Sequence, residues 1–274
     1  MPTTPTSTAG TIQSIWRFPV KSMLGEEVSS AEVTERGLAG DRAYALISTE
    51  TGKVGSAKNP QRWPNLFQFH ATLPNSVSSA TEIPPAQITC PDGARVTTDQ
   101  ADIDSRLSAA VGQPVRLAKA GLEGVSSEGY WPAFDWLDAP DSVFEFPLPP
   151  KTFFDGAVLL LTTTSTLRYL HSLSPTSRFD VRRFRPNILI DDGPGQEGIV
   201  ENNWIGRTLT IGEVELWIER PCGRCIMTML PQEDLPKDPN VLRTLVKANG
   251  GNLGVYAVVR KGGQIHQKDT VHLI

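Results

Sequence analysis

Short segments rich in β-branched and aromatic residues recur along the whole chain, separated by glycine, proline, asparagine and aspartate. The 274 residues include 23 glycines and 22 prolines, which leave little room for long uninterrupted helices. This pattern predicts short strands joined by turns. In the first half we expect one helix over residues 101–111, where apolar residues recur at helical spacing, and strands over residues 11–17, 27–34, 42–48, 66–73, 86–90, 95–98 and 115–118.

The second half adds two helices to the same pattern. One is expected over residues 163–173, which begin with hydroxyl side chains, and the other between Asp238-Pro239 and Gly250, residue types that begin and end helices. The predicted fold class is mostly β with a few helices (α+β), in two β-barrel-like halves joined by an aromatic-rich ordered crossing at residues 121–150. Strands are expected over residues 157–161, 187–190, 208–211, 213–218, 253–260 and 264–266, with turns at Gly212 and Gly262-Gly263.

Composition narrows the classes of function. The 26 basic and 30 acidic residues give a net charge of −4 without a basic block, which excludes sequence-independent nucleic-acid binding and favours a small anion in a pocket. Three cysteines are too few for a disulfide framework, and residues 1–10 resemble a disordered tail rather than a signal peptide. The longest apolar run, residues 157–161, falls far short of the roughly 20 residues of a membrane span. We therefore expect a cytoplasmic protein.

Two of the three cysteines, Cys222 and Cys225, lie three residues apart directly after a β-patterned stretch. Arg220 and Arg224 beside them favour the thiolate, a soft metal ligand and a nucleophile. Four interpretations are open: a redox dithiol, half of a zinc site, the ligand of a metal cofactor, or buried core cysteines. The residues after Cys225 reach a proline too soon for the helix of a redox dithiol, and the four scattered histidines offer no zinc partners.

Four segments, taken together and in this order, resemble the motifs of the MOSC proteins. These proteins bind the molybdenum cofactor and are related to the C-terminal part of molybdenum cofactor sulfurase. The resemblance covers the chain from about residue 11 to its end and implies an N-terminal MOSC-associated β-barrel domain over residues 11–120 and a MOSC domain over residues 121–274. The segments are Phe18-Pro19-Val20-Lys21-Ser22, Gly40-Asp41-Arg42, Arg183-Phe184-Arg185-Pro186-Asn187 and Pro221-Cys222-Gly223-Arg224-Cys225-Ile226-Met227-Thr228.

The resemblance extends to the amidoxime-reducing members of the family, and it implies a molybdenum-dependent oxidoreductase that reduces small N-hydroxylated substrates. It assigns Cys225 as molybdenum ligand and catalytic residue, with molybdopterin as the cofactor and Cys222 as a neighbour. The electrons would come from an external donor, a flavin reductase with a haem or iron–sulfur carrier, because three cysteines cannot complete a four-cysteine cluster beside this site. Pyridoxal phosphate binding is a further family-level expectation, for which no residue is assigned.

The remaining motif residues are interpreted as a cradle for the phosphate and pterin of that cofactor. A phosphate favours clustered or forked cationic donors, and a helix N-terminus also binds anions. The predicted cofactor-binding residues are Lys21, Ser22, Arg42, Thr164, Ser165, Arg185, Asn187, Gly223 and Arg224. Two other functions stay open: a sulfur-carrier or cofactor-handling module in which Cys225 bears a persulfide, and a non-catalytic β-rich binding protein whose cysteines are structural.

Overall fold

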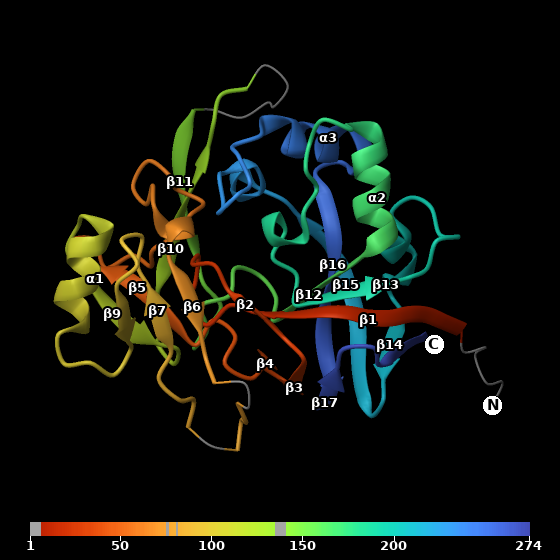
Figure 1. Ribbon diagram of the computed structural model, residues 1–274, viewed down its shortest axis with the longest axis horizontal. Helices are drawn as coiled ribbons and strands as arrows, with labels where there is room; N and C mark the ends of the chain where they lie inside the picture. The colour runs from red at the N-terminus through yellow and green to blue at the C-terminus, as the bar shows by residue number, and fades with distance from the viewer. Residues whose placement is uncertain (1–6, 75–76, 81, 135–140) are drawn as a thin grey trace.

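A closed seven-stranded β-barrel forms the larger lobe of the computed structural model, which describes residues 7–74, 77–80, 82–134 and 141–274 (Figure 1). The strand order is β13-β12-β16-β15-β14-β18-β1, and β1 pairs back with β13 to close the ring. Among the barrel strands only β12 and β13 run parallel, so they need a crossover, which helix α2 (Thr164–Leu173) provides. The barrel strands are β1 (Ser7–Arg17), β12 (Leu159–Thr163), β13 (Ile188–Asp191), β14 (Thr208–Ile211), β15 (Val214–Gly223), β16 (Asn252–Lys261) and β18 (Thr270–Leu273).

Apolar side chains fill the barrel. Buried and less buried residues alternate along β14 and along residues 214–218 of β15, so that every second side chain points inward, as the period of a strand requires. Ile12, Leu209, Leu216, Ile218 and Val255 meet in this core and are at most 1% exposed. A small barrel packed in this way leaves no room for a ligand inside, so a binding site must lie outside the barrel interior.

The smaller lobe, here called the N-terminal lobe, is formed by the described residues between 44 and 147 and consists of short sheets around helix α1 (Ile103–Val111). Strands β5 and β9 pair with each other, β10 and β11 form a second antiparallel pair, and Val54 bridges the two pairs. Met227, from the cysteine motif of the barrel lobe, packs into the core of this lobe and so ties the two lobes together. The strands are β5 (Tyr44–Ser48), β6 (His70–Thr72), β7 (Gln87–Thr89), β8 (Arg95–Thr97), β9 (Val115–Lys119), β10 (Ser126–Trp131) and β11 (Ser142–Pro147).

The other elements connect or cover the lobes. Helices α2 (Thr164–Leu173) and α3 (Pro239–Asn249) lie side by side against the barrel lobe, and α1 lies at the far edge of the N-terminal lobe (Figure 1). Short strands attach to the barrel core: β2 (Glu26–Val28), β3 (Ser30–Thr34), β4 (Gly37–Leu38) and β17 (Gly263–His266). The 3-10 turns are η1 (Leu66–Gln68), η2 (Val181–Arg183), η3 (Val200–Trp204) and η4 (Ile226–Met229).

The mostly β fold predicted from the sequence is confirmed, and the structure corrects details. The tail expected over residues 1–10 was too long, because β1 already begins at Ser7; residues 1–6 lie outside the described residues, as do residues 135–140 of the expected crossing. The strand expected over residues 66–73 is a 3-10 turn followed by β6. β17, expected to turn back beside β16 at Gly262-Gly263, pairs with β3 instead. Among the described residues, no helix is long and apolar enough to cross a membrane.

Candidate functional site

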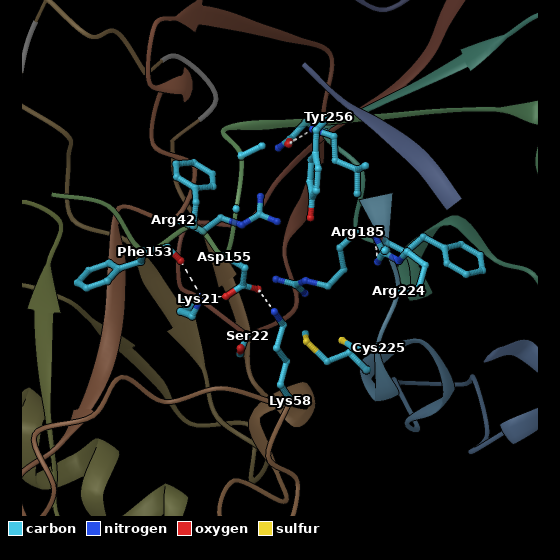
Figure 2. A pocket seen from close by; sticks show the side chains of 18 residues that line it. Lys21, Ser22, Arg42, Lys58, Phe153, Asp155, Arg185, Arg224, Cys225 and Tyr256 are labelled. Carbon is cyan, nitrogen blue, oxygen red and sulfur yellow. Dashed lines mark hydrogen bonds and ion pairs between the residues drawn. The ribbon is translucent and has the colours of Figure 1, made fainter. Parts of the chain in front are cut away.

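A pocket lies where the two lobes and their connecting segments meet (Figure 2). Five basic side chains line it, together with one carboxylate and one thiol, although the whole chain carries a net charge of −4. Such a concentration of positive charge in a half-enclosed site attracts a small anion. The charged and thiol-bearing lining residues are Lys21, Arg42, Lys58, Asp155, Arg185, Arg224 and Cys225.

Asp155 organises the lysine side of the pocket. One carboxylate oxygen, Oδ1, lies 2.5 Å from Lys21 Nζ and the other, Oδ2, lies 3.1 Å from Lys58 Nζ. Burial opposes ionisation of this carboxyl, but the two ammonium groups outweigh it and hold the pKa of Asp155 well below its usual range. Lys21 Nζ also donates to the Phe153 carbonyl oxygen at 2.8 Å. The carboxylate therefore fixes two ammonium groups that still have N–H groups to offer a ligand.

Arg185 is held differently, because it pairs with no carboxylate among the residues that the structure describes. Its guanidinium lies 4.1 Å from the ring centre of Phe18, and Nη1 donates to the Met23 carbonyl oxygen at 2.7 Å. Burial, followed by the nearby charge of Arg42, lowers the pKa of Arg185 to about 9. The group stays charged at neutral pH at a cost in free energy, which a bound anion would offset.

Three pocket residues have a backbone conformation that residues other than glycine rarely adopt. The φ angles of Ser22, Arg42 and Arg185 are 64°, 48° and 53°. Only three other non-glycine residues in the described part of the chain have positive φ, and none of them lines this pocket. Backbone strain of this kind concentrates at functional sites, where the surrounding structure holds it in place.

Asp41 and Asn187 provide part of that support. Asp41 accepts from the Phe18 backbone N–H at 2.7 Å and pairs with the Arg42 guanidinium. The Asn187 amide donates to Asp41 Oδ2 at 2.8 Å and to the Trp16 carbonyl oxygen at 3.3 Å. Asn187 lines the pocket, but its side-chain donors are already used within the chain.

The two cysteines have different surroundings. Cys225 is half-buried and lines the pocket, whereas Cys222 is 1% exposed and lies behind the wall. Arg183 donates to the carbonyl oxygens of Thr228 and Leu230 and so fixes the turn that follows Cys225. No group of three or more histidine, cysteine, aspartate or glutamate side chains gathers in the described residues to hold a metal. A metal at Cys225 would take its other ligands from a bound molecule or solvent.

The structure brings together most of the predicted site residues and adds three residues with titratable side chains that were not predicted from the sequence. Ser22 accepts from the Ala57 backbone N–H at 3.1 Å, which places the loop that carries Lys58. The missed residues are Lys58, Asp155 and Tyr256, all of which face the pocket in Figure 2. The predicted residues that line it are Lys21, Ser22, Arg42, Arg185, Asn187, Gly223, Arg224 and Cys225.

Thr164 and Ser165 are not part of this pocket. Their hydroxyls donate to the Asp192 carboxylate, at 2.8 Å and 2.5 Å. The N-terminus of α2 thus binds an anion, as its position predicts, but that anion is a side chain of the same protein. Next to it, Glu201 is 0% exposed and accepts from three hydroxyls, those of Thr162, Thr163 and Thr166.

Glu201 makes stability depend on pH in a direction that can be tested. Burial raises the pKa of Glu201 above the ordinary 4.5, although the threonine hydroxyls oppose this effect. Its contribution to stability is therefore complete below pH 4.5 and is lost as the pH rises through the folded-state value. We expect Glu201→Gln to remove this loss, so that its free energy of unfolding in urea falls less between pH 5 and pH 8 than that of the wild type. The difference should be about 1.4 kcal/mol for every unit by which the folded-state pKa of Glu201 exceeds the unfolded one. A wild type that loses no more stability than the variant contradicts the assignment.

Fold and site together define a two-lobed β protein with a thiol-bearing, cationic pocket. The model of the MOSC N-terminal beta barrel domain matches residues 9–125, and the model of the MOSC domain matches residues 150–272. The chain therefore belongs to the MOSC domain proteins.

Curated relatives match over different lengths. The chain is 32% identical to the molybdenum cofactor sulfurase of Drosophila persimilis over 120 residues, 43% of this chain and 14% of the relative. It is 26% identical to that of Danio rerio over 90% of this chain and 31% of the relative. It is 25% identical to mitochondrial amidoxime reducing component 2 of Homo sapiens over 80% of this chain and 66% of the relative. The chain thus spans less than a third of these sulfurases.

Proposed function

We propose that this protein binds the molybdenum cofactor, molybdopterin, in the cationic pocket and acts as an oxidoreductase that reduces N-hydroxylated compounds. The observation that carries the proposal is that the Cys225 thiol and five basic side chains line one pocket. Cofactor and substrate class are supported by the similarity to molybdenum cofactor sulfurase and to the amidoxime reducing component. A soft thiolate and forked cations are also the donor types that a molybdenum centre and a phosphate require.

The residues of the pocket fit such a group. Arg224 Nε is buried without a hydrogen-bond partner, and neither Arg185 nor Arg224 has a carboxylate partner in the described part of the chain. These unused donors are the complement of an anionic ligand. Arg185, Arg42 and Lys21 would hold the phosphate, and the Cys225 thiolate would hold the metal.

Reduction of an N–OH group to N–H takes two electrons and two protons and releases one water. The cofactor, when bound, supplies a metal that exchanges two electrons. Burial opposes the charge on Lys58, but the charges of Asp155 and Cys225 raise the pKa of its ammonium group, so Lys58 keeps its proton. Tyr256 keeps its phenol proton, because burial and then the charge of Cys222 raise its pKa. Lys58 Nζ and the Tyr256 hydroxyl would therefore donate hydrogen bonds to the substrate oxygen, and solvent would replace the protons consumed.

The electrons would come from a separate donor. An iron–sulfur centre takes four cysteines as a rule, and the chain contains three, one of which is the proposed metal ligand. A flavin reductase with a haem or iron–sulfur carrier is therefore the proposed partner.

Metal and pterin analysis of the wild type, made in a host that synthesises molybdopterin, tests the proposal. We expect about one molybdenum and one pterin per chain, and reduction of benzamidoxime with reduced viologen as electron source. Protein that is folded but carries no molybdenum would contradict the proposal and favour a sulfur-carrier role, which mass spectrometry would detect as a persulfide on Cys225.

A further inference from the structure

We propose that Cys222 is a positioning residue for Arg224, whose guanidinium its sulfur holds in place at the pocket wall. The inference rests on the anionic ligand of the proposed function and explains the second cysteine of the motif. Arg224 Nη1 donates to Cys222 Sγ at 2.9 Å, which makes this sulfur the side-chain acceptor of the guanidinium. Cys222 Sγ itself lies 3.8 Å from the Gly223 carbonyl oxygen, a long and weak contact.

Arg224 has an unusual set of partners for a buried arginine. Besides the sulfur contact, Nη2 donates to the Phe184 carbonyl oxygen at 2.7 Å, and the backbone N–H donates to the Gly251 carbonyl oxygen at 2.8 Å. A sulfur and a carbonyl oxygen thus hold the two terminal nitrogens of the guanidinium, no carboxylate pairs with it in the described part of the chain, and Nε has no partner. The group is fixed in direction, yet its charge is left for a ligand in the pocket that it lines.

Cys222 lacks the apolar neighbours expected for a cysteine that only fills a hydrophobic core. It is 1% exposed, but among the described residues it belongs to none of the apolar clusters, whereas Cys90 lies within the core of the N-terminal lobe. Instead it interacts with two lining residues, Arg224 and Tyr256. Arg220 covers the ring of Tyr256 with its guanidinium 4.6 Å from the ring centre. Cys222 therefore contacts residues that line the pocket but does not line the pocket itself.

Titration of metal-free protein with inorganic phosphate, by calorimetry, measures this role without any need for molybdenum. We expect Cys222→Ala to weaken phosphate binding by about fivefold, the effect of one lost hydrogen bond to a charged group, because Arg224 loses its fixed direction. Cys222→Ser keeps an acceptor at this position and should restore most of the affinity. Cys90→Ala is the matched control, because it removes a buried thiol from elsewhere, and it should leave phosphate affinity unchanged.

A double-mutant cycle separates positioning from a general structural effect. If Cys222 acts through Arg224, the double variant of Cys222→Ala and Arg224→Met binds phosphate no more weakly than Arg224→Met alone. A double variant that loses the full factor of both single changes overturns the inference, as does a Cys222→Ser variant as weak as Cys222→Ala. Should Cys222→Ala fail to fold, the same cycle with Cys222→Val, which also lacks an acceptor but fills more of the buried space, decides. If the wild type carries no molybdenum but the cycle still shows coupling between Cys222 and Arg224, the proposed function is contradicted and the present inference stands.

Discussion

Cys225→Ala is expected to lose both bound molybdenum and reductase activity, each by at least about a hundredfold, because a soft thiolate ligand is replaced by a methyl group. Molybdenum is measured by elemental analysis on purified protein, and activity with reduced viologen and benzamidoxime. The half-buried side chain lines the pocket and only borders the core of the N-terminal lobe, so the variant should fold and melt close to the wild type. Loss of metal would then reflect the lost ligand.

Two further variants make this result specific. Cys225→Ser keeps the size and polarity of the side chain but offers a hard oxygen, and it should lose molybdenum almost as completely. Cys222→Ala keeps the proposed ligand and should retain the metal. Full loss in Cys222→Ala together with full retention in Cys225→Ala would reverse the assignment of the ligand.

Pterin analysis of the same samples separates the two anchors of the cofactor. If the cationic side chains hold the phosphate independently of the thiolate, Cys225→Ala should retain more pterin than molybdenum. Equal loss of both would indicate that the cofactor is held mainly through its metal.

The fold could be predicted where its signals are local. Asp238 accepts from the Asn240 backbone N–H, and Gly250, with φ of 57°, ends α3, so both helix ends were readable from residue type alone. Strand partners are not local. β17 pairs with β3, more than 220 residues earlier, and β1 closes the barrel between β13 and β18. The periodicity of the sequence predicts that a segment is a strand but does not predict which other strand it pairs with.

The candidate site also contains residues that could be predicted from the sequence and residues that could not. Arg185 and Cys225 were predicted because they lie in motifs that resemble a family, and the fold brings them to one pocket. Lys58 and Asp155 lie outside those motifs and have ordinary neighbours in sequence, so only their ion pair across the fold reveals them. Ser165 was misplaced for the opposite reason: the anion preference of a helix N-terminus is general, but here Asp192 satisfies it.

Arg185→Met is expected to weaken ligand binding and, at the same time, to stabilise the ligand-free protein. Methionine fills similar space beside Phe18 but removes a buried cation, and the gain should exceed the cost of the acceptor left at Met23, for a net increase of about 1 kcal/mol in the free energy of unfolding. Phosphate should raise the free energy of unfolding of the wild type, because it binds to the folded state. The variant should need at least a tenfold higher phosphate concentration for the same increase. Arg185→Lys, which keeps the charge, is the control and should retain part of this response.

The pH dependence of Arg185→Met gives the prediction a second, independent readout. The folded-state pKa of Arg185, about 9, lies below its ordinary value of 12.5, so its contribution to stability is complete above 12.5 and is lost as the pH falls through 9. The stability advantage of the variant should therefore be largest at neutral pH and shrink as the pH is raised past 9, when both proteins are unfolded in urea without phosphate. An advantage that is absent at pH 7, or that grows toward pH 10, would show that the guanidinium is not held at a cost in the empty pocket. The argument that an anionic ligand offsets that cost would then fail, even if Cys225 proved to be the metal ligand.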